Sequence, residues 1–180
     1  MSSYESFARV YDLFMDNIPY EEWCGYLHTL LEKYDVTDGL VLELGCGTGT
    51  MTALLTERGY ELIGVDGSED MLLEAREKAQ TLTGVPPLFL HQSMPELDLY
   101  GTVEAAICCL DSLNYLTDAR EVRETFRRLH LFIAPGGSLV FDVHALGKLE
   151  AMDGQVWLDE REDVYCVWRT EFRRSICTYW

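Results

Sequence analysis

Between residues 40 and 143, short apolar runs alternate with segments of helical periodicity, and this alternation limits the possible folds more than any other feature of the chain. Five runs are rich in Val, Ile and Leu, as expected of strands buried on both faces. They are residues 40–44, 61–65, 86–90, 103–110 and 138–143. Between most of them, apolar residues recur every three or four positions, as in helices that cover a sheet. We therefore predict an α/β fold: a Rossmann-like, doubly wound, mostly parallel sheet with helices on both faces.

Residues at the element boundaries predict where these helices begin and end. Ser68 and Asp118 are suitable N-caps, because a short side-chain oxygen can accept a hydrogen bond from the first helical turn. Gly59 is expected to end the helix after the first strand. The helix that Asp118 begins is expected to include Ile133 and to stop at the Pro-Gly-Gly sequence of residues 135–137.

The segments on either side of this core follow other patterns. Residues 20–34 have helical periodicity, so residues 1–38 are predicted to form an N-terminal helical segment ahead of the core at 39–146. Residues 147–180 contain three apparent strands without intervening helices, which predicts an antiparallel extension. Because the last of these strands runs into the end of the chain without a turn, we expect this extension to be incomplete. The whole chain of 180 residues suffices for a single domain.

The charge and the cysteines exclude several classes of function. The formal net charge is −17, with 14 basic and 31 acidic residues, so polyanions would be repelled and neither bulk nucleic acid nor a membrane surface is an expected partner. Six cysteines occur without a C-x-x-C pair or a zinc-like Cys/His spacing, which predicts reduced thiols and no metal. With no signal peptide and no long apolar segment, a cytoplasmic protein is expected.

A glycine-rich loop follows the first predicted strand. Glycines at positions 45, 47 and 49 allow a tight turn and close approach of a ligand. In open parallel sheets, small molecules bind beyond the carboxyl ends of the strands, which is where this loop lies. A dinucleotide fingerprint of the form G-x-G-x-x-G fails because Thr50 takes the third glycine position, and the G-K-[ST] of a P-loop is absent. Both phosphate-binding interpretations are therefore weakened.

The loop and its surroundings resemble a known enzyme family. Glu43-Leu44-Gly45-Cys46-Gly47-Thr48-Gly49, followed by Asp66 at the end of the second strand, resembles the first two motifs of class I S-adenosylmethionine-dependent methyltransferases. Gln92-Ser93-Met94 and Cys109-Leu110-Asp111 stand where that family completes its cofactor pocket. The resemblance covers residues 40 to about 143. The opening Phe7-Ala8-Arg9-Val10-Tyr11-Asp12, with Tyr20 and Trp23 after it, is similar to the N-terminal lid of small bacterial methyltransferases whose substrate is unassigned.

The resemblance implies a site for S-adenosylmethionine, converted to S-adenosylhomocysteine. Asp66 would hold the two ribose hydroxyls, the backbone of residues 45–47 would lie against the methionine moiety, and residues 93–94 would meet the adenine edge. Many relatives carry an acidic residue at the position of Ser93. The candidate cofactor-binding residues are Tyr11, Tyr20, Glu43, Gly45, Cys46, Gly47, Asp66, Gly67, Met71, Ser93, Met94, Leu110 and Asp111. Tyr11, Tyr20 and Trp23 are equally compatible with a role as core aromatic residues.

The reaction implied by this cofactor is an in-line displacement, for which the protein supplies mainly alignment of the reactants. Asp111, Tyr115 and His144 follow the fourth and fifth strands, so each could orient a small-molecule acceptor or take its proton, and none is singled out as catalytic. Two alternatives stay open. The chain could bind the cofactor without catalysing transfer, or it could be a nicotinamide-dependent oxidoreductase. Neither the acceptor nor the oligomeric state follows from the sequence.

Overall fold

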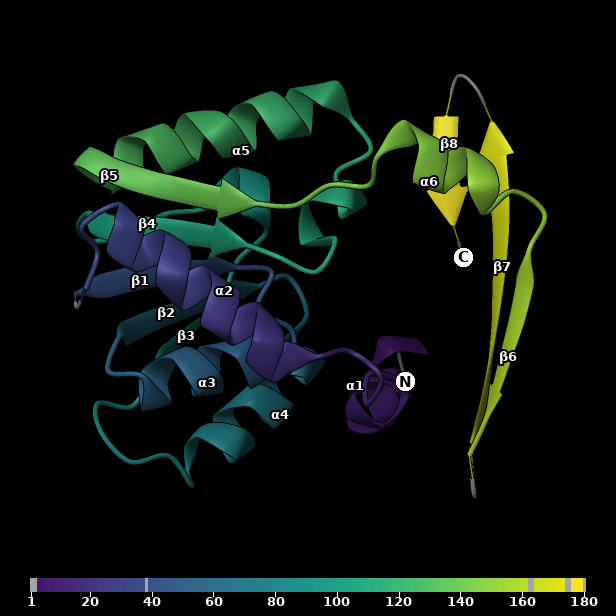
Figure 1. The fold of residues 1–180 in the computed structure, drawn as a ribbon, viewed down its shortest axis with the longest axis horizontal. Coiled ribbons are helices and arrows are strands. Elements are labelled where there is room, and N and C mark those ends of the chain that lie inside the picture. Colours follow the sequence, from purple (N-terminus) through teal and green to yellow (C-terminus); the bar gives the residue numbers. More distant parts are fainter. Residues whose placement is uncertain (1–2, 38, 162–163, 174–175, 180) are drawn as a thin grey trace.

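A five-stranded parallel sheet forms the core of the computed structural model, which describes residues 3–37, 39–161, 164–173 and 176–179 (Figure 1). In spatial order the strands are β3 (Leu88–His91), β2 (Glu61–Asp66), β1 (Leu40–Leu44), β4 (Val103–Cys108) and β5 (Ile133–Phe141). The chain proceeds outward from β1 to β3 in one direction and from β4 to β5 in the other. The prediction of a doubly wound parallel sheet is therefore confirmed, and the order reverses between β1 and β4.

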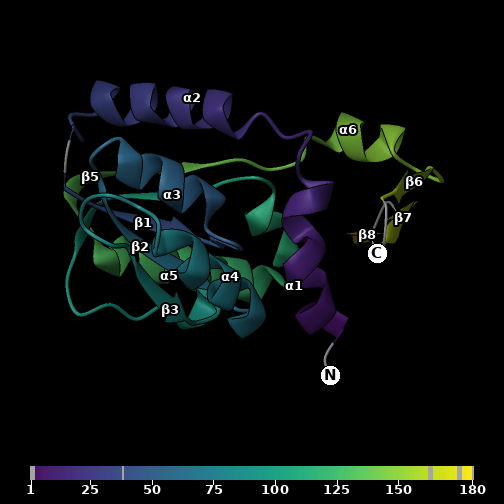
Figure 2. The same cartoon turned by 90° about the horizontal axis from the view of Figure 1, so that it is seen from below.

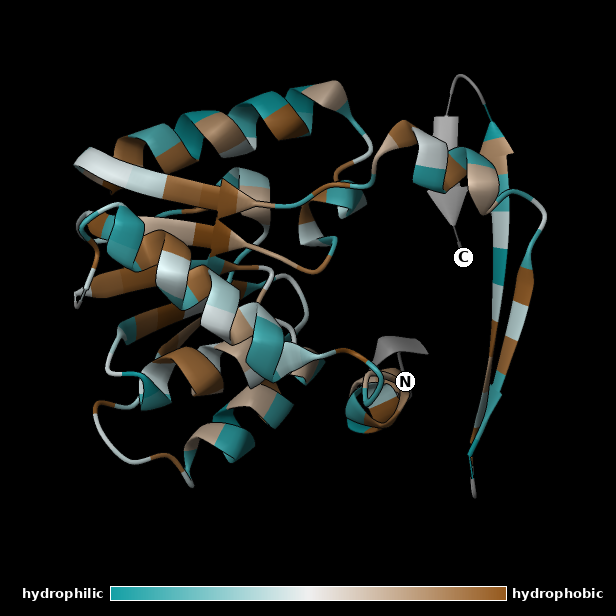
Figure 3. Ribbon diagram, viewed as in Figure 1, coloured by the Kyte–Doolittle hydropathy of each residue, from teal (hydrophilic) through white to brown (hydrophobic). Residues whose placement is uncertain are grey.

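Helices cover both faces of this sheet. They are α2 (Tyr20–Lys33), α3 (Thr50–Glu57), α4 (Glu69–Ala79) and α5 (Ala119–Phe132), with the short 3₁₀ helices η1 (Met94–Glu96) and η2 (Ser112–Tyr115). The N-terminal helix α1 (Ser3–Phe14) packs on α4 instead. One apolar core joins α2 and α3 to the sheet, and a second joins α5 to the opposite face. The strands are hydrophobic along most of their length (Figure 3), as expected when both faces of a sheet are covered.

The predicted helix caps are confirmed. The Ser68 side chain accepts a hydrogen bond from the Met71 amide at the start of α4, and Asp118 accepts one from the Arg120 amide at the start of α5. Gly59 follows the end of α3 with a φ of 97°, a conformation that glycine adopts without steric cost. These short-range signals therefore fix the first turns of α4 and α5 and the end of α3.

The prediction for the fifth strand was wrong at its start. β5 begins at Ile133, immediately after α5, and residues 135–137 lie inside the strand rather than before it. Val103 pairs with Ile133 and Ala105 with Ser138, so residues 134–137 bulge opposite a single residue of β4. A Cβ on Gly137 would lie 2.6 Å from the Glu104 carbonyl oxygen. The glycine thus permits close contact between the two strands.

Three further boundaries differ from the sequence-based expectation. β3 begins at Leu88, because the two preceding prolines have no amide hydrogen to donate to the sheet. β4 ends at Cys108 rather than at residue 110, since Leu110 and Asp111 have positive φ values of 56° and 66°. β2 extends one residue beyond its predicted end at residue 65, to Asp66.

An antiparallel extension follows the core, as predicted. The strands β6 (Val156–Glu160), β7 (Tyr165–Arg173) and β8 (Ile176–Tyr179) form a separate three-stranded sheet that stands apart from the core (Figure 1). Residues 175 and 180, which the prediction also assigned to the last strand, lie outside the described residues. The short helix α6 (Leu146–Ala151) was missed. Within the described ranges, none of the helices has the length and apolarity needed to cross a membrane.

Candidate functional site

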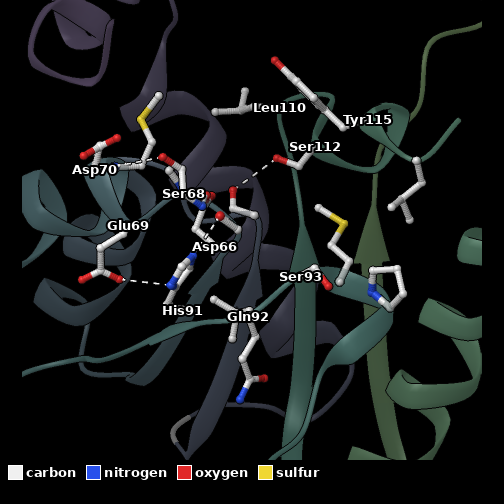
Figure 4. Close-up of a pocket in the computed structure, with 18 of the residues that line it drawn as sticks. Asp66, Ser68, Glu69, Asp70, His91, Gln92, Ser93, Leu110, Ser112 and Tyr115 are labelled. Carbon is white, nitrogen blue, oxygen red and sulfur yellow. Dashed lines mark hydrogen bonds and ion pairs between the residues drawn. The ribbon is translucent and has the colours of Figure 1, made fainter. Parts of the chain in front are cut away.

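A cavity of about 700 Å³ opens beyond the carboxyl ends of β1, β2 and β4 (Figure 4). It lies at the point where strand order reverses, as expected for a ligand site in this architecture. Its walls come from α1, the loop after β1, the start of α4, the segment after β3 and η2. The lining residues are Phe7, Tyr11, Gly45, Gly47, Val65, Asp66, Gly67, Ser68, Glu69, Asp70, Met71, His91, Gln92, Ser93, Met94, Pro95, Leu110, Ser112, Tyr115, Leu116 and Glu121.

Backbone hydrogen bonds, within the loop and to β2, fix the conformation of the glycine loop. Gly45, Gly47 and Gly49 all have positive φ values, of 77°, 53° and 73°, which residues with a side chain adopt only at a cost. The amides of Gly45 and Cys46 both donate to the Val65 carbonyl, and the Gly49 amide donates to the Cys46 carbonyl. Because these amides point into the fold, they do not form the cluster of free N–H groups that binds phosphate.

Asp66, at the end of β2, joins the glycine loop to the start of α4. Its Oδ2 accepts a hydrogen bond of 2.8 Å from the Gly47 amide, and its Oδ1 accepts one of 2.8 Å from the Ser68 amide. A carboxylate can accept about four hydrogen bonds, so both oxygens retain capacity toward the cavity that Asp66 lines. The carboxylate is thereby fixed in place and still able to bind a ligand with two hydroxyl donors.

The cavity is acidic. Asp66, Glu69, Asp70 and Glu121 line it, and its lining residues include neither lysine nor arginine. Such a wall favours a cationic or neutral ligand over a diphosphate, because opposite charges attract across a low-dielectric cavity. The cavity therefore has the same sign of charge as the chain as a whole, whose formal net charge is −17.

Glu43 and Cys46 lie behind the loop rather than in the cavity wall. Burial raises the pKa of Glu43 to about 8, although a hydrogen bond from the Thr52 hydroxyl opposes the shift. Burial also raises the pKa of the Cys46 thiol, and the nearby Glu43 carboxyl adds to the effect. Both side chains are almost wholly shielded from solvent. They support the glycine loop from inside the fold, and a protonated thiol is a poor nucleophile.

Tyr11 and Tyr20 meet near the cavity, although only Tyr11 lines it. Burial raises the pKa of Tyr11, with a contribution from Tyr20 and Tyr115. Burial also raises the pKa of Tyr20 to about 12, and its hydrogen bond with Tyr11 opposes that shift. Tyr20 and Trp23 pack against the core that joins α2 and α3 to the sheet. Tyr20 therefore supports Tyr11, which lines the cavity.

The segment after β3 forms another wall of the cavity. Ser93 lines it and donates a hydrogen bond of 2.5 Å to Glu96. The neighbouring Gln92 side chain bonds the Asp98 backbone at both its amide and its carbonyl, which fixes the turn. With its hydrogen directed to a carboxylate, the Ser93 oxygen keeps its lone pairs for a donor from a ligand.

Beyond β4, two consecutive non-glycine residues, Leu110 and Asp111, occupy the left-handed region of backbone conformation. Asp111 Oδ1 lies 2.9 Å from His144 Nδ1, and the Asp111 amide donates to Asp142 Oδ2. Burial raises the pKa of Asp111, and the facing His144 and Lys148 oppose the shift. Leu110 and Tyr115 line the cavity, whereas Asp111 and His144 do not. The three candidate acid–base residues are thus divided between the wall and the structure behind it.

Nine of the thirteen predicted site residues line one cavity. They are Tyr11, Gly45, Gly47, Asp66, Gly67, Met71, Ser93, Met94 and Leu110. Tyr20, Glu43, Cys46 and Asp111 lie outside its wall. Sequence reasoning missed Glu69 and Asp70, which follow the N-cap Ser68, and Ser112, whose hydroxyl donates to the Gly45 carbonyl. The position of Glu69 and Asp70 just after Asp66 could have indicated them, whereas no local signal marks Ser112.

A protein family matches most of the core. Residues 41–137 match the family described as a methyltransferase domain. The chain is 37% identical over 169 residues to a putative methyltransferase of Bacillus subtilis, an alignment that covers 93% of this chain and 66% of that protein. This chain therefore spans slightly less than two thirds of the length of that relative. The described residues contain no cluster of His, Cys, Asp and Glu side chains suited to a metal.

Solved structures resemble the whole arrangement. An S-adenosylmethionine-dependent methyltransferase from Clostridium acetobutylicum is 28% identical, with a TM-score of 0.81, and the match covers 94% of this chain and 70% of that one. A sugar N-methyltransferase from Streptoalloteichus is 25% identical, with a TM-score of 0.74, and the match covers 92% of this chain and 66% of that one. Both matches therefore extend beyond residues 41–137, over nearly all of this chain.

Proposed function

Because this chain belongs to the class I S-adenosylmethionine-dependent methyltransferases, we propose that its cavity binds S-adenosylmethionine and presents the methyl group to a small-molecule acceptor. The observation that carries the proposal is the arrangement of Asp66. Its carboxylate is fixed by the Gly47 and Ser68 amides at 2.8 Å, and it faces an acidic cavity of about 700 Å³. Cavities of several hundred cubic ångströms suit ligands of this size.

The residues present fit this cofactor in charge and in space. The cofactor carries a sulfonium, an ammonium and a carboxylate, so its net charge is positive. The cavity offers carboxylates of Asp66, Glu69, Asp70 and Glu121 without a lysine or arginine. A Cβ on Gly47 would meet no atom within 4 Å, so this glycine leaves room for a ligand against the backbone. We propose that the nine lining residues contact the cofactor and that Tyr20, Glu43, Cys46 and Asp111 support them from behind.

The sulfonium of the cofactor supplies an electrophilic methyl carbon, so the protein has to align an acceptor and exclude water. Phe7 and Tyr11 of α1 close one side of the cavity, and Tyr115 of η2 lies on another. The sugar N-methyltransferase among the structural relatives acts on a small molecule, which supports a small acceptor here. The net charge of −17 argues against bulk nucleic acid.

A reducing, cytoplasmic setting fits the cysteines. Cys24, Cys46, Cys108, Cys109 and Cys166 are all free thiols, and the first four are buried. Free buried thiols behave as small core residues and persist where disulfides are kept reduced. The sixth, Cys177, lies in β8, where the structure describes only the backbone.

Calorimetric titration with S-adenosylhomocysteine tests the proposal. We expect wild-type protein to bind it and Asp66→Ala to weaken binding about 100-fold, because the variant loses the carboxylate acceptor and the anchor of the loop. Glu124→Gln serves as the control, because Glu124 does not line the cavity and the change removes the same charge. A protein that binds NAD or NADP but not S-adenosylhomocysteine would contradict the proposal.

A further inference from the structure

A polar network centred on Asp12 joins the N-terminal helix α1 to the wall of the cavity. Asp12 Oδ1 accepts a hydrogen bond of 2.6 Å from the Thr48 hydroxyl, within the glycine loop. Its Oδ2 accepts one of 2.9 Å from the Lys78 ammonium, in the last turn of α4. One carboxylate thereby joins three segments that are distant in the sequence.

The network extends past Asp12 to the start of α3. Lys78 Nζ donates to the Thr50 hydroxyl at 2.5 Å and to the Thr48 hydroxyl at 3.4 Å. An ammonium has three donors, and here all three have acceptors. The Thr48 side chain is almost completely buried, so a lost partner at this point would leave a polar group without compensation.

Helix α1 combines this polar network with apolar contacts, since its residues Ala8 and Phe14 are buried. It is not covered by another layer of the fold and packs mainly on α4 (Figures 1 and 2). Phe7 and Tyr11, one helical turn apart and in edge-to-face contact at 5.6 Å, reach from it into the cavity wall. Tyr11 directly precedes Asp12, so any movement of Asp12 moves the aromatic wall as well.

We propose that Asp12 is a positioning residue, which holds α1 against the glycine loop and thereby keeps Phe7 and Tyr11 closed over the bound cofactor. This inference rests on the proposed function. A single half-exposed ion pair contributes little by itself, but here the carboxylate also accepts from the buried Thr48 hydroxyl. Charge-assisted hydrogen bonds of this kind are stronger than neutral ones. Asp12 thus links the loop that would contact the cofactor to the helix that would cover it, so we expect the two to move together.

Removing the hydrogen bonds of Asp12 or Lys78 should let α1 move away from the cavity, without changing the residues that contact the cofactor from the sheet side. If α1 is closed only part of the time, the apparent dissociation constant rises in inverse proportion to the closed fraction. We expect Asp12→Asn and Lys78→Met each to speed dissociation of S-adenosylhomocysteine about 10-fold in stopped-flow displacement, with little change in association. Arg127→Met is the matched control for lost positive charge, because among the described residues Arg127 pairs only with Glu124, on the same helix α5. It should leave dissociation unchanged.

A double-variant cycle separates positioning from general stability. Asp12→Asn combined with Lys78→Met should dissociate no faster than the faster single variant, since both act through one network. Hydrogen exchange of α1 should rise in both single variants and no longer fall when ligand is added. Thr48→Val, which keeps the shape of a buried side chain, provides a third probe if either single variant unfolds at the assay temperature.

Two results would overturn the inference. The first is that wild type binds S-adenosylhomocysteine while Asp12→Asn, Lys78→Met and Thr48→Val all release it at rates within about two-fold of the wild-type rate. The other is additive acceleration in the double variant, which would mean that Asp12 and Lys78 act separately. A wild-type protein that fails to bind S-adenosylhomocysteine contradicts the proposed function instead, so the two failures are distinguishable.

Discussion

The two halves of the sheet build their carboxyl-terminal rims in different ways. After β1 and β2, the turn uses glycines, and its amides are satisfied by the Val65 carbonyl and by Asp66. After β4 and β5, the turn uses Leu110 and Asp111 in left-handed conformations and depends on the side chains of Asp142 and His144. The first rim is therefore specified by neighbouring residues, and the second by contacts between distant ones.

The two rims also differ in the conformational energy of their backbones. Glycine adopts positive φ without a steric penalty, whereas each non-glycine residue there costs about 1 kcal/mol or more. Such strain persists only where the surroundings hold it, and the Asp111 amide bond to Asp142 does so here. Strained residues of this kind cluster at active sites and ligand clamps. In our proposal the glycine rim carries the cofactor, and of the two strained residues only Leu110, which lines the cavity, contacts it.

The largest expected effect is at Gly45, where the two rims touch. A Cβ there would lie 2.7 Å from Ser112 Cβ and 3.0 Å from Met94 Cε, at a φ of 77°. We expect Gly45→Ala to lower the free energy of unfolding by about 3 kcal/mol, as overpacking and backbone strain add. Urea denaturation measures the loss.

Gly47→Ala is the matched control, because its φ is also positive but nothing lies within 4 Å of its Cβ position. It should cost only about 1 kcal/mol of stability while filling space next to the proposed ligand. Equal losses of stability in the two variants would show that contact between the rims is not what Gly45 provides.

The next largest expected effect is a dependence of the unfolding free energy on pH, caused by Glu43. Its pKa in the folded protein is about 8, against an ordinary value near 4.5, because the side chain is buried. The folded state holds the proton more tightly, so the contribution to stability is complete below about pH 4.5 and is lost as the pH rises through about 8. Wild type should therefore lose stability relative to Glu43→Gln across this window, by at most about 1.4 kcal/mol for each pH unit.

Thermal or urea unfolding of both proteins at pH 5, 7 and 9 checks this expectation. The glutamine keeps the shape and an acceptor for the Thr52 hydroxyl, so the comparison isolates the ionisation. Parallel stability curves across the three pH values would contradict a buried, proton-holding Glu43.

The sequence predicted the glycine rim well because its signals are local. Strand β1, the turn at residues 45–49, Asp66 and the Ser68 cap lie within 29 consecutive positions, and spacing alone identifies them. The predicted end of β4 was wrong for the opposite reason. Apolar Cys109 and Leu110 continue the strand pattern, and only the distant Asp142 and His144 explain why the chain turns left-handed there.

Two other errors have the same origin. The prediction placed Pro135 to Gly137 in a loop, because proline and glycine usually end regular structure. The structure keeps them in β5 as a bulge, where Gly137 fits against the Glu104 carbonyl of β4. The wall residues Glu69 and Asp70 were also missed, because a helical first turn is commonly acidic without facing a ligand. In each case a long-range contact decided between two local interpretations.

The smallest expected effect sharpens the comparison between the rims. Asp111→Asn keeps the shape of the side chain and tolerates the left-handed conformation, but it removes the charge that faces His144 at 2.9 Å. We expect a loss of stability of about 1 kcal/mol and an affinity for S-adenosylhomocysteine within about two-fold of wild type, because Asp111 does not line the cavity.

Asp66→Asn is the counterpart on the other rim, and the same calorimetric titration measures both variants. It makes the same chemical change to a carboxylate that lines the cavity and accepts from Gly47 and Ser68, so it should weaken binding far more than Asp111→Asn. If Asp111→Asn weakens binding as much as Asp66→Asn does, cofactor binding depends on both rims. That result would contradict the proposed difference between them. If only Asp66→Asn weakens it, Asp111 takes no direct part in cofactor binding, and variants that affect the acceptor should be sought around Tyr115, on the cavity wall.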